Sequence, residues 1–238
     1  MAKSRDITSR AGGAEPAVSP RSEVDAFLER AGKIAPPSQA RGRMIFALDA
    51  TMSRQPTWDL ACQLQGEMFD AASAVGGLSV QLVYFRGIGE SRASPFVANA
   101  GALRNLMVKI DCRGGNTQIA KVLGHVRREA EKRPVAALAY IGDAMEENPD
   151  KLCQIAGEIG LLGVRAFVFH EGRDPAAERT FREIARLTGG AYLPFNSASA
   201  AELRSLLGAV ATYAAGGLKA LETSKGAAAR LLLPHLRR

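Results

Sequence analysis

Short apolar stretches alternate along this chain with longer segments of helical periodicity, and this alternation constrains the fold more than any other feature. Short apolar runs predict buried strands, whereas apolar residues spaced three and four apart predict helices that cover a sheet. Alternating strands and helices favour a mostly parallel sheet with helices on both faces. The predicted strands are residues 44–48, 79–85, 135–141, 164–169 and 191–195, with a short edge strand at 95–97.

Helix-capping residues and prolines mark where the intervening helices begin. The first of these helices ends at the Gly76–Gly77 pair. Since crossovers between parallel strands are right-handed, few topologies remain for the predicted doubly wound α/β fold. Helices are predicted to begin near Thr57, Asn99, Thr117, Asn148, Asp174 and Ser199, the last with a capping box completed by Glu202.

Oxygen-bearing side chains follow the first predicted strand directly, at Asp49, Thr51 and Ser53. Ligands bind where parallel strands leave a sheet at their carboxyl ends. Hard oxygen ligands suit a small divalent cation such as Mg²⁺ or Mn²⁺. The alternative interpretation is an ordinary turn, in which Asp, Thr and Ser are common.

Two later segments carry the same kind of side chain. Thr117 follows Gly114, Gly115 and Asn116, whose glycines allow close backbone approach. Asp143 follows the strand at 135–141. Taken singly, Thr117 can be a helix cap and Asp143 a turn residue. If the first and fourth strands are neighbours, however, Asp143 meets the Asp49 loop.

The ordered set Asp-x-Thr-x-Ser, Gly-x-Thr and a strand ending in Asp resembles the metal-ion-dependent adhesion site of von Willebrand factor type A (VWA) domains. The resemblance covers residues 43–214 and implies a six-stranded sheet in the order 3-2-1-4-5-6. It departs from the usual family pattern at Thr51, where Ser is common, and at Ala144, where Gly is common. The hydroxyl ligand is retained at Thr51.

By this resemblance, Asp49 orients the site, Thr51 and Ser53 bind the metal directly, and Thr117 and Asp143 exchange direct and water-mediated roles. A carboxylate from a partner protein would take the open position. The resemblance also implies partners such as AAA+ ATPases or multiprotein assemblies. The predicted partner-binding rim is Gly115, Asn116, Glu146 and Glu147, the two glutamates being expected as solvated charges.

The three cysteines are scattered, odd in number and form no CxxC pair, so the sequence predicts neither a disulfide framework nor a zinc site. Residues 1–23 lack the apolar segment of a signal peptide. No apolar stretch approaches the roughly 20 residues that span a bilayer. We therefore expect a reduced, cytoplasmic protein that does not bind membranes.

The net charge of +7 comes from the two ends of the chain. Residues 44–214 hold 18 basic and 18 acidic residues, whereas residues 1–43 carry +3 and residues 215–238 carry +4. Residues 1–42 are expected to be a flexible tail with a short helix at 24–31, residues 43–214 one domain, and residues 215–238 a basic tail. Basic tails are usually solvated. The tails lack the aromatic and basic motifs of nucleic-acid binding, which remains the alternative.

Enzymatic signatures are sparse. The histidines show no triad or metal-ligand spacing, and no lysine-containing phosphate loop is present. His170 follows a strand and is either a rim residue or a satisfied structural histidine. We expect a non-enzymatic adaptor, with a Mg²⁺-dependent hydrolase as the alternative. The apolar run Leu231–Leu233 is expected to be either a frayed terminus or a docking peptide.

Overall fold

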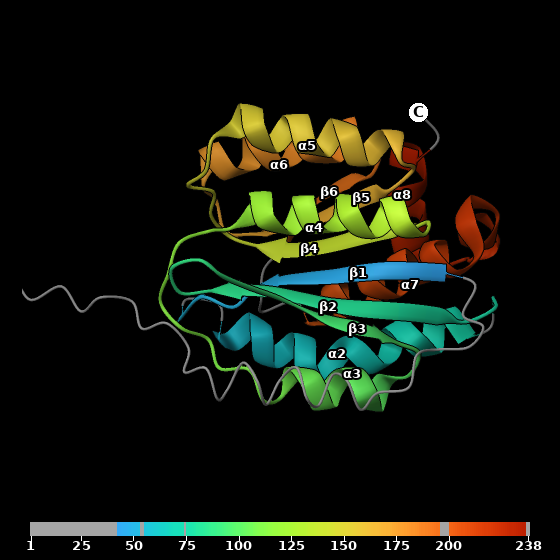
Figure 1. The fold of residues 1–238 in the computed structure, drawn as a ribbon. Helices are drawn as coiled ribbons and strands as arrows, with labels where there is room; N and C mark the ends of the chain where they lie inside the picture. The colour runs from blue at the N-terminus through green and yellow to red at the C-terminus, as the bar shows by residue number, and fades with distance from the viewer. Residues whose placement is uncertain (1–41, 53–54, 74, 196–199, 237–238) are drawn as a thin grey trace, which may run out of the picture.

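A computed structural model describes residues 42–52, 55–73, 75–195 and 200–236. Six strands form one sheet in the order β3-β2-β1-β4-β5-β6 (Figure 1). Strand β3 pairs antiparallel with β2 at one edge, and all other pairings are parallel. The predicted α/β class and strand order are confirmed. The strands are β1 (Gly42–Asp49), β2 (Leu78–Arg86), β3 (Glu90–Val97), β4 (Ala137–Gly142), β5 (Arg165–Glu171) and β6 (Ala191–Phe195).

Helices cover both faces of the sheet because alternate strand residues are apolar on each side. One face packs against α4 (Ile119–Lys132), α5 (Pro149–Leu161) and α6 (Pro175–Leu187), which lie above the sheet in Figure 1. The other face packs against α2 (Gln55–Ser73), α3 (Ala100–Met107) and α7 (Ala200–Thr223). No helix within the described ranges is both long enough and apolar enough to cross a membrane.

Side-chain caps begin three of these helices as predicted. Asn99, Asn148 and Asp174 each accept a backbone N–H of the following turn, at 2.8, 3.1 and 2.8 Å. Each cap satisfies a donor that the helix itself leaves unpaired. Thr57 is different: it lies inside α2, and its hydroxyl donates to the Glu171 carboxylate at the end of β5.

The edge strand β3 is longer than the predicted segment 95–97 and begins at Glu90. Its first half reads Glu-Ser-Arg-Ala-Ser, which has no apolar alternation to detect. Ser94 joins the strand to β2, since its hydroxyl accepts the Leu82 N–H at 3.0 Å and its carbonyl accepts from Gln81 at 2.8 Å. An edge strand can therefore form from polar residues.

The C-terminal segment is a packed part of the fold. Helix α7 continues past residue 214 to Thr223 across non-helical Gly217, and α8 (Ala227–Leu236) packs against it. Leu232 is fully buried, so the expectation of an exposed apolar run is wrong there, although Leu231 is exposed. Burial of this apolar helix face on the sheet-flanking core outweighs the local basic charge.

The N-terminal boundary also shifts slightly. Gly42, expected in the tail, begins β1, and a Cβ atom there would lie 2.1 Å from the Ala214 carbonyl oxygen. The rest of the predicted tail, including the helix at 24–31, lies outside the described residues. The predicted capping residue Ser199 does so as well.

Candidate metal centre

Asp49 lies at the carboxyl end of β1 and is 3% exposed. Its Oδ1 accepts the backbone N–H of Thr51 at 2.8 Å, which turns the chain sharply after the strand. The next residue, Ala50, donates its N–H to the Phe85 carbonyl at 2.9 Å and accepts from Arg113 N at 3.0 Å. The loop is thus held on both sides, and the carboxylate is fixed in place.

Asp143 follows β4, the parallel neighbour of β1. The register pairs Leu48 with Ile141, so both strands end at the same level of the sheet. Asp49, Thr51, Thr117 and Asp143 all line one cavity of about 260 Å³. Four of the five predicted metal ligands are therefore brought together, and the fifth, Ser53, lies outside the described residues. We call this space the acidic cavity; Met52, Gly114, Gly115, Ala144 and Glu146 complete its described lining.

Gly115 lines the acidic cavity at a point where the backbone of the β2–β3 hairpin comes very close. A Cβ atom at this position would lie 2.3 Å from the Gly87 carbonyl oxygen and 2.4 Å from its nitrogen. Neither backbone atom can move away as a flexible side chain would. The neighbouring Asn116 is exposed and does not line the cavity. The close approach explains why a glycine is needed at 115.

The loop at Thr117 and the loop after Asp143 are joined by a reciprocal pair of hydrogen bonds. The Thr117 N–H donates to Glu146 Oε2, and the Glu146 N–H donates to Thr117 Oγ1, both at 3.1 Å. The Glu146 carboxylate, expected as a solvated rim charge, therefore also fixes the position of a predicted ligand. Sequence reasoning had no signal for this contact, because the residues are 29 positions apart.

Glu147 does not lie on the rim where the sequence predicted it. Its carboxylate accepts the backbone N–H groups of Ile119 and Ala120, the latter at 3.0 Å. It therefore caps the N-terminus of α4, where the N-cap residue Gln118 makes no side-chain cap hydrogen bond. A carboxylate is favoured there by the unpaired N–H groups and by the helix dipole. The helix cap, which was the alternative interpretation of Thr117, comes instead from another loop.

The residues of the acidic cavity fit a small divalent cation. Two aspartates, Glu146 and two threonines line it, and no described Lys, Arg or His does. Such a space gathers negative charge that a hard cation would balance through oxygen ligands. Among the described residues, no three His, Cys, Asp or Glu side chains form a metal-binding group by themselves. Metal binding here would therefore depend on the threonine hydroxyls as well as on the aspartates.

A buried histidine, His170, contacts the backbone of Asp143. His170 is 1% exposed, and its Nε2 lies 3.2 Å from the Asp143 backbone oxygen. A carbonyl only accepts, so Nε2 carries the hydrogen, and in a neutral imidazole Nδ1 then accepts from the Tyr192 hydroxyl at 2.7 Å. Burial, followed by the nearby charge of Glu178, raises the pKa of the Tyr192 hydroxyl, which keeps it protonated. His170 is thus a satisfied structural residue.

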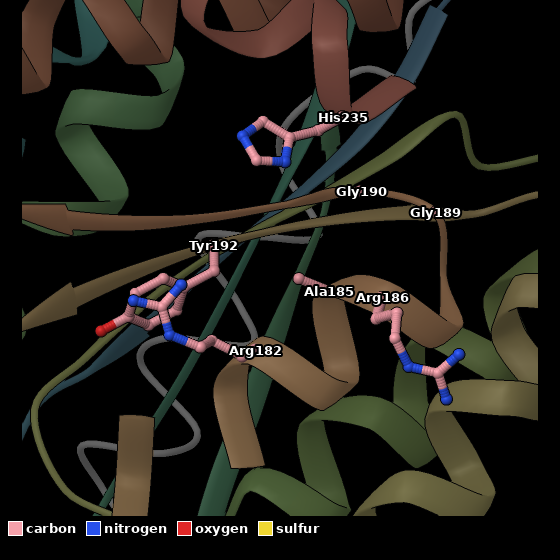
Figure 2. A pocket seen from close by; sticks show the side chains of 7 residues that line it. All are labelled: Arg182, Ala185, Arg186, Gly189, Gly190, Tyr192 and His235. Carbon is pink, nitrogen blue, oxygen red and sulfur yellow. The ribbon is translucent and has the colours of Figure 1, made fainter. Parts of the chain in front are cut away.

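Tyr192 lies on the edge strand β6, so its contact with His170 connects Asp143 to the edge of the sheet. Arg182 from α6 lies over the tyrosine ring, 4.2 Å from its centroid (Figure 2). Both side chains line a cavity of about 460 Å³, to which α8 contributes His235. Arg186 points away from the tyrosine and pairs with Glu183. A continuous set of contacts therefore joins this outer cavity to the backbone of Asp143.

No protein-family model matches the sequence, and no curated protein matches it either. Solved structures do match, and von Willebrand factor type A domains are among them. This chain has the VWA fold. A von Willebrand factor type A protein from Catenulispora acidiphila is 17% identical, with a TM-score of 0.56, over 73% of this chain and 43% of that one.

Two other VWA-fold structures are informative. The SpRpn10 VWA domain is 10% identical, with a TM-score of 0.55, and the match covers 71% of this chain and 94% of that domain. Proximal thread matrix protein 1 from the mussel byssus is 12% identical, with a TM-score of 0.57, over 73% of this chain and 46% of that protein. That mussel structure has a zinc-occupied metal-ion-dependent adhesion site. This chain thus spans less than half of the Catenulispora and mussel proteins.

Proposed function

We propose that this VWA-fold chain is a metal-dependent protein-binding module that engages an acidic group of a partner protein. The observation that carries the proposal is the acidic cavity, in which Asp49, Thr51, Thr117 and Asp143 converge. These residues, with Ser53, would hold Mg²⁺ or Mn²⁺. The metal-occupied site of the mussel protein supports divalent-cation binding by this fold. When bound, the cation would supply a coordination position for a partner's carboxylate oxygen.

The charges of the residues in the acidic cavity suit a divalent cation. Asp49 and Asp143 supply two negative charges, which a divalent cation balances, and the threonines add ligands without adding charge. Glu146 stands at the edge of the cavity, where its hydrogen bond to Thr117 occupies one carboxylate oxygen. If the Glu146 carboxylate bound the metal itself, it would take the partner's position and repel acidic groups. Its hydrogen bond to Thr117 is therefore consistent with the proposal.

We propose a non-enzymatic role, as an adaptor or assembly factor in the cytoplasm. Cys112, near the acidic cavity, is a poor nucleophile, because burial and then the charge of Asp49 raise the pKa of its thiol to about 12. His170 is fully engaged in hydrogen bonds. A hydrolase would need a positioned general base, which none of these groups supplies. An AAA+ ATPase or another component of a multiprotein assembly is the kind of partner we expect.

The first test is calorimetric titration of Mg²⁺ and of Mn²⁺ into wild type, Asp49→Ala and the matched control Asp150→Ala. Asp150 is an exposed aspartate in the first turn of α5, away from the cavity lining. We expect one site in wild type and in the control, and about ten- to hundredfold weaker binding in Asp49→Ala, as for loss of a residue that orients the direct ligands. Equal binding by all three proteins would refute the metal site.

The second test addresses the partner. Proteins retained by the wild type in Mg²⁺ should be lost in EDTA and from Thr117→Ala and Asp143→Ala, while circular dichroism shows that both variants remain folded. A partner that stays bound to all of these samples would use another surface of the molecule.

A further inference from the structure

A second cavity, of about 220 Å³, lies between the edge strand β3 and helix α4. Its polar lining consists of Ser91, Arg92, Lys121, His125 and Arg128, above a floor of small and branched apolar residues. No described Asp or Glu lines it. We call this space the basic cleft. Its lining is opposite in charge to that of the acidic cavity.

The fold of α4 brings the basic groups together. Lys121, His125 and Arg128 are spaced by four and three residues, so they share one face of the helix. Gly124 lies on the same face, and a Cβ atom there would be 3.6 Å from Arg128 Nη1. The Arg128 guanidinium therefore lies over Gly124, on the side nearer Lys121. A glycine in mid-helix leaves open the space that the guanidinium borders.

The cations of the basic cleft are not neutralised by carboxylates of the residues that the structure describes. Lys121 Nζ donates to the Gly89 carbonyl at 2.8 Å and to Gln118 Oε1 at 2.9 Å, and both acceptors are uncharged. No hydrogen bond or ion pair joins the side chain of Arg128 to another described residue. By contrast, Arg127 and Lys132 on the same helix pair with glutamates.

Arg92 shows the same lack of partners at the rim of the cleft. Its Nε is buried and has no hydrogen-bond partner among the described residues. The one hydrogen bond that its side chain makes to a described residue is a donation from Nη1 to the Ser91 carbonyl at 3.4 Å. A buried donor without a partner costs free energy that a bound acceptor would recover. Three cations with no counter-ion among the described residues thus surround one small cavity.

We propose that the basic cleft binds a phosphate group, either as inorganic phosphate or as the phosphate of a small phosphomonoester. A phosphate dianion offers two charges and several acceptor oxygens to Lys and Arg donors, which bind phosphate by charge-assisted hydrogen bonds. The cavity volume suits a small anion rather than an extended chain. This proposal does not rest on the metal site, because the two cavities have no lining residue in common.

The test is calorimetric titration of inorganic phosphate, and separately of O-phosphoserine, at constant ionic strength. EDTA is present throughout, so that no cation in the acidic cavity can bind phosphate. The variant is Arg128→Gln, which breaks no side-chain hydrogen bond or ion pair between described residues. Its matched control is Arg179→Gln, an exposed arginine on α6, outside the basic cleft. A chloride titration measures unspecific screening.

We expect saturable phosphate binding to wild type and to Arg179→Gln, and about tenfold or more weaker binding to Arg128→Gln, as for one lost charge-assisted hydrogen bond. Arg128→Lys, which keeps the charge, should recover part of the loss. Tighter binding of O-phosphoserine would identify a phosphomonoester as the ligand, and tighter binding of inorganic phosphate would identify the free anion. Binding that does not saturate, or that falls equally in both glutamine variants, would overturn the proposal.

Discussion

The acidic cavity and the basic cleft are similar in volume, about 260 and 220 Å³, but opposite in charge. Aspartates with hydroxyls line the first, and no described base does so; Lys121, Arg128 and Arg92 line the second, and no described acid does so. Both lie in a segment whose acidic and basic residues are equal in number. A net charge of zero therefore conceals two local excesses, each of which would be relieved by an ion of opposite sign.

The two cavities also differ in how they are built. Asp49 and Asp143 stand at the ends of neighbouring parallel strands, where backbone and side-chain hydrogen bonds fix the loops. The basic cleft is formed by long side chains on a helix beside an edge strand, and few contacts hold them. The acidic cavity should therefore tolerate change poorly and the basic cleft should tolerate it well.

Gly115→Ala should have the largest effect. Its new Cβ atom would lie 2.3 Å from backbone atoms of Gly87, so a loop must shift, and overpacking of this kind costs about 1–3 kcal/mol. We expect a lower free energy of unfolding in urea and weaker Mg²⁺ binding. The matched control is Gly114→Ala in the same loop, where a Cβ atom would meet nothing within 4 Å. If the two variants proved equally stable, the acidic cavity would not be rigid at this point.

Glu147→Ala should cause the second-largest decrease in the free energy of unfolding. The variant leaves two N–H groups of α4 without their acceptor, and loss of a helix cap costs about 0.5–2 kcal/mol. Glu147→Gln keeps an acceptor oxygen without the charge and should be intermediate. Glu131→Ala removes an exposed carboxylate paired with Arg127 and should change unfolding by less than about 0.5 kcal/mol. A Glu147→Ala protein as stable as Glu131→Ala would show that the cap contributes nothing.

Sequence reasoning could predict the acidic cavity but not the basic cleft, for a physical reason. Asp49 and Asp143 directly follow apolar strands, so strand order alone places them together. Lys121 and Arg128 meet β3 only because that strand forms from polar residues that show no apolar alternation. The contacts of Glu146 and Glu147 were also unpredictable, since each joins loops that only the tertiary fold brings together.

The C-terminal end of the chain also shows which features local sequence patterns can predict and which they cannot. The class and three helix caps followed from local patterns such as Asn148 before Pro149, whereas the strand order followed from the resemblance to VWA domains. The packing of α8 did not, because a basic, apolar segment such as residues 227–236 reads equally well as a frayed end. Only burial of Leu232 against the core distinguishes the two.

Gly124→Ala should have a smaller effect, of opposite sign to that of Gly115→Ala. Alanine in a helix interior is favoured over glycine by about 0.5–1 kcal/mol, and its Cβ would make an ordinary contact of 3.6 Å with Arg128. We expect a higher midpoint of urea unfolding together with weaker phosphate binding, because the methyl group would contact the guanidinium of Arg128, which lines the basic cleft. Destabilisation as large as that of Gly115→Ala would break the contrast between the two regions.

The smallest expected effect is the pH dependence that His125 gives to the basic cleft. Gln81 donates its amide N–H to the Ser94 carbonyl, so its Oε1 faces His125 and accepts from Nε2 at 2.9 Å. Burial is the main cause that lowers the pKa of His125; Arg128 and Lys132 lower it further, and Glu129 opposes them. The folded protein therefore resists protonation at this histidine.

The sign of the stability change follows from this lowered pKa. As the pH falls below about 6.5, the histidine takes up a proton in the unfolded chain before it does so in the folded protein. The free energy of unfolding should therefore be highest above pH 6.5 and decrease as the pH falls toward the folded-state pKa. His125→Gln should show a shallower decrease in urea unfolding experiments between pH 7 and pH 5. Parallel curves for the two proteins would mean that His125 does not titrate differently on folding.

The same pH experiment in phosphate buffer tests whether phosphate binds beside His125. An anion bound beside His125 favours the protonated imidazole and thus raises its pKa toward the unfolded value. The wild-type decrease in stability should then be shallower in phosphate than in chloride at the same ionic strength, whereas His125→Gln should show no such difference between the salts. A wild-type slope that is the same in both salts would place any bound phosphate away from His125, and so outside the basic cleft.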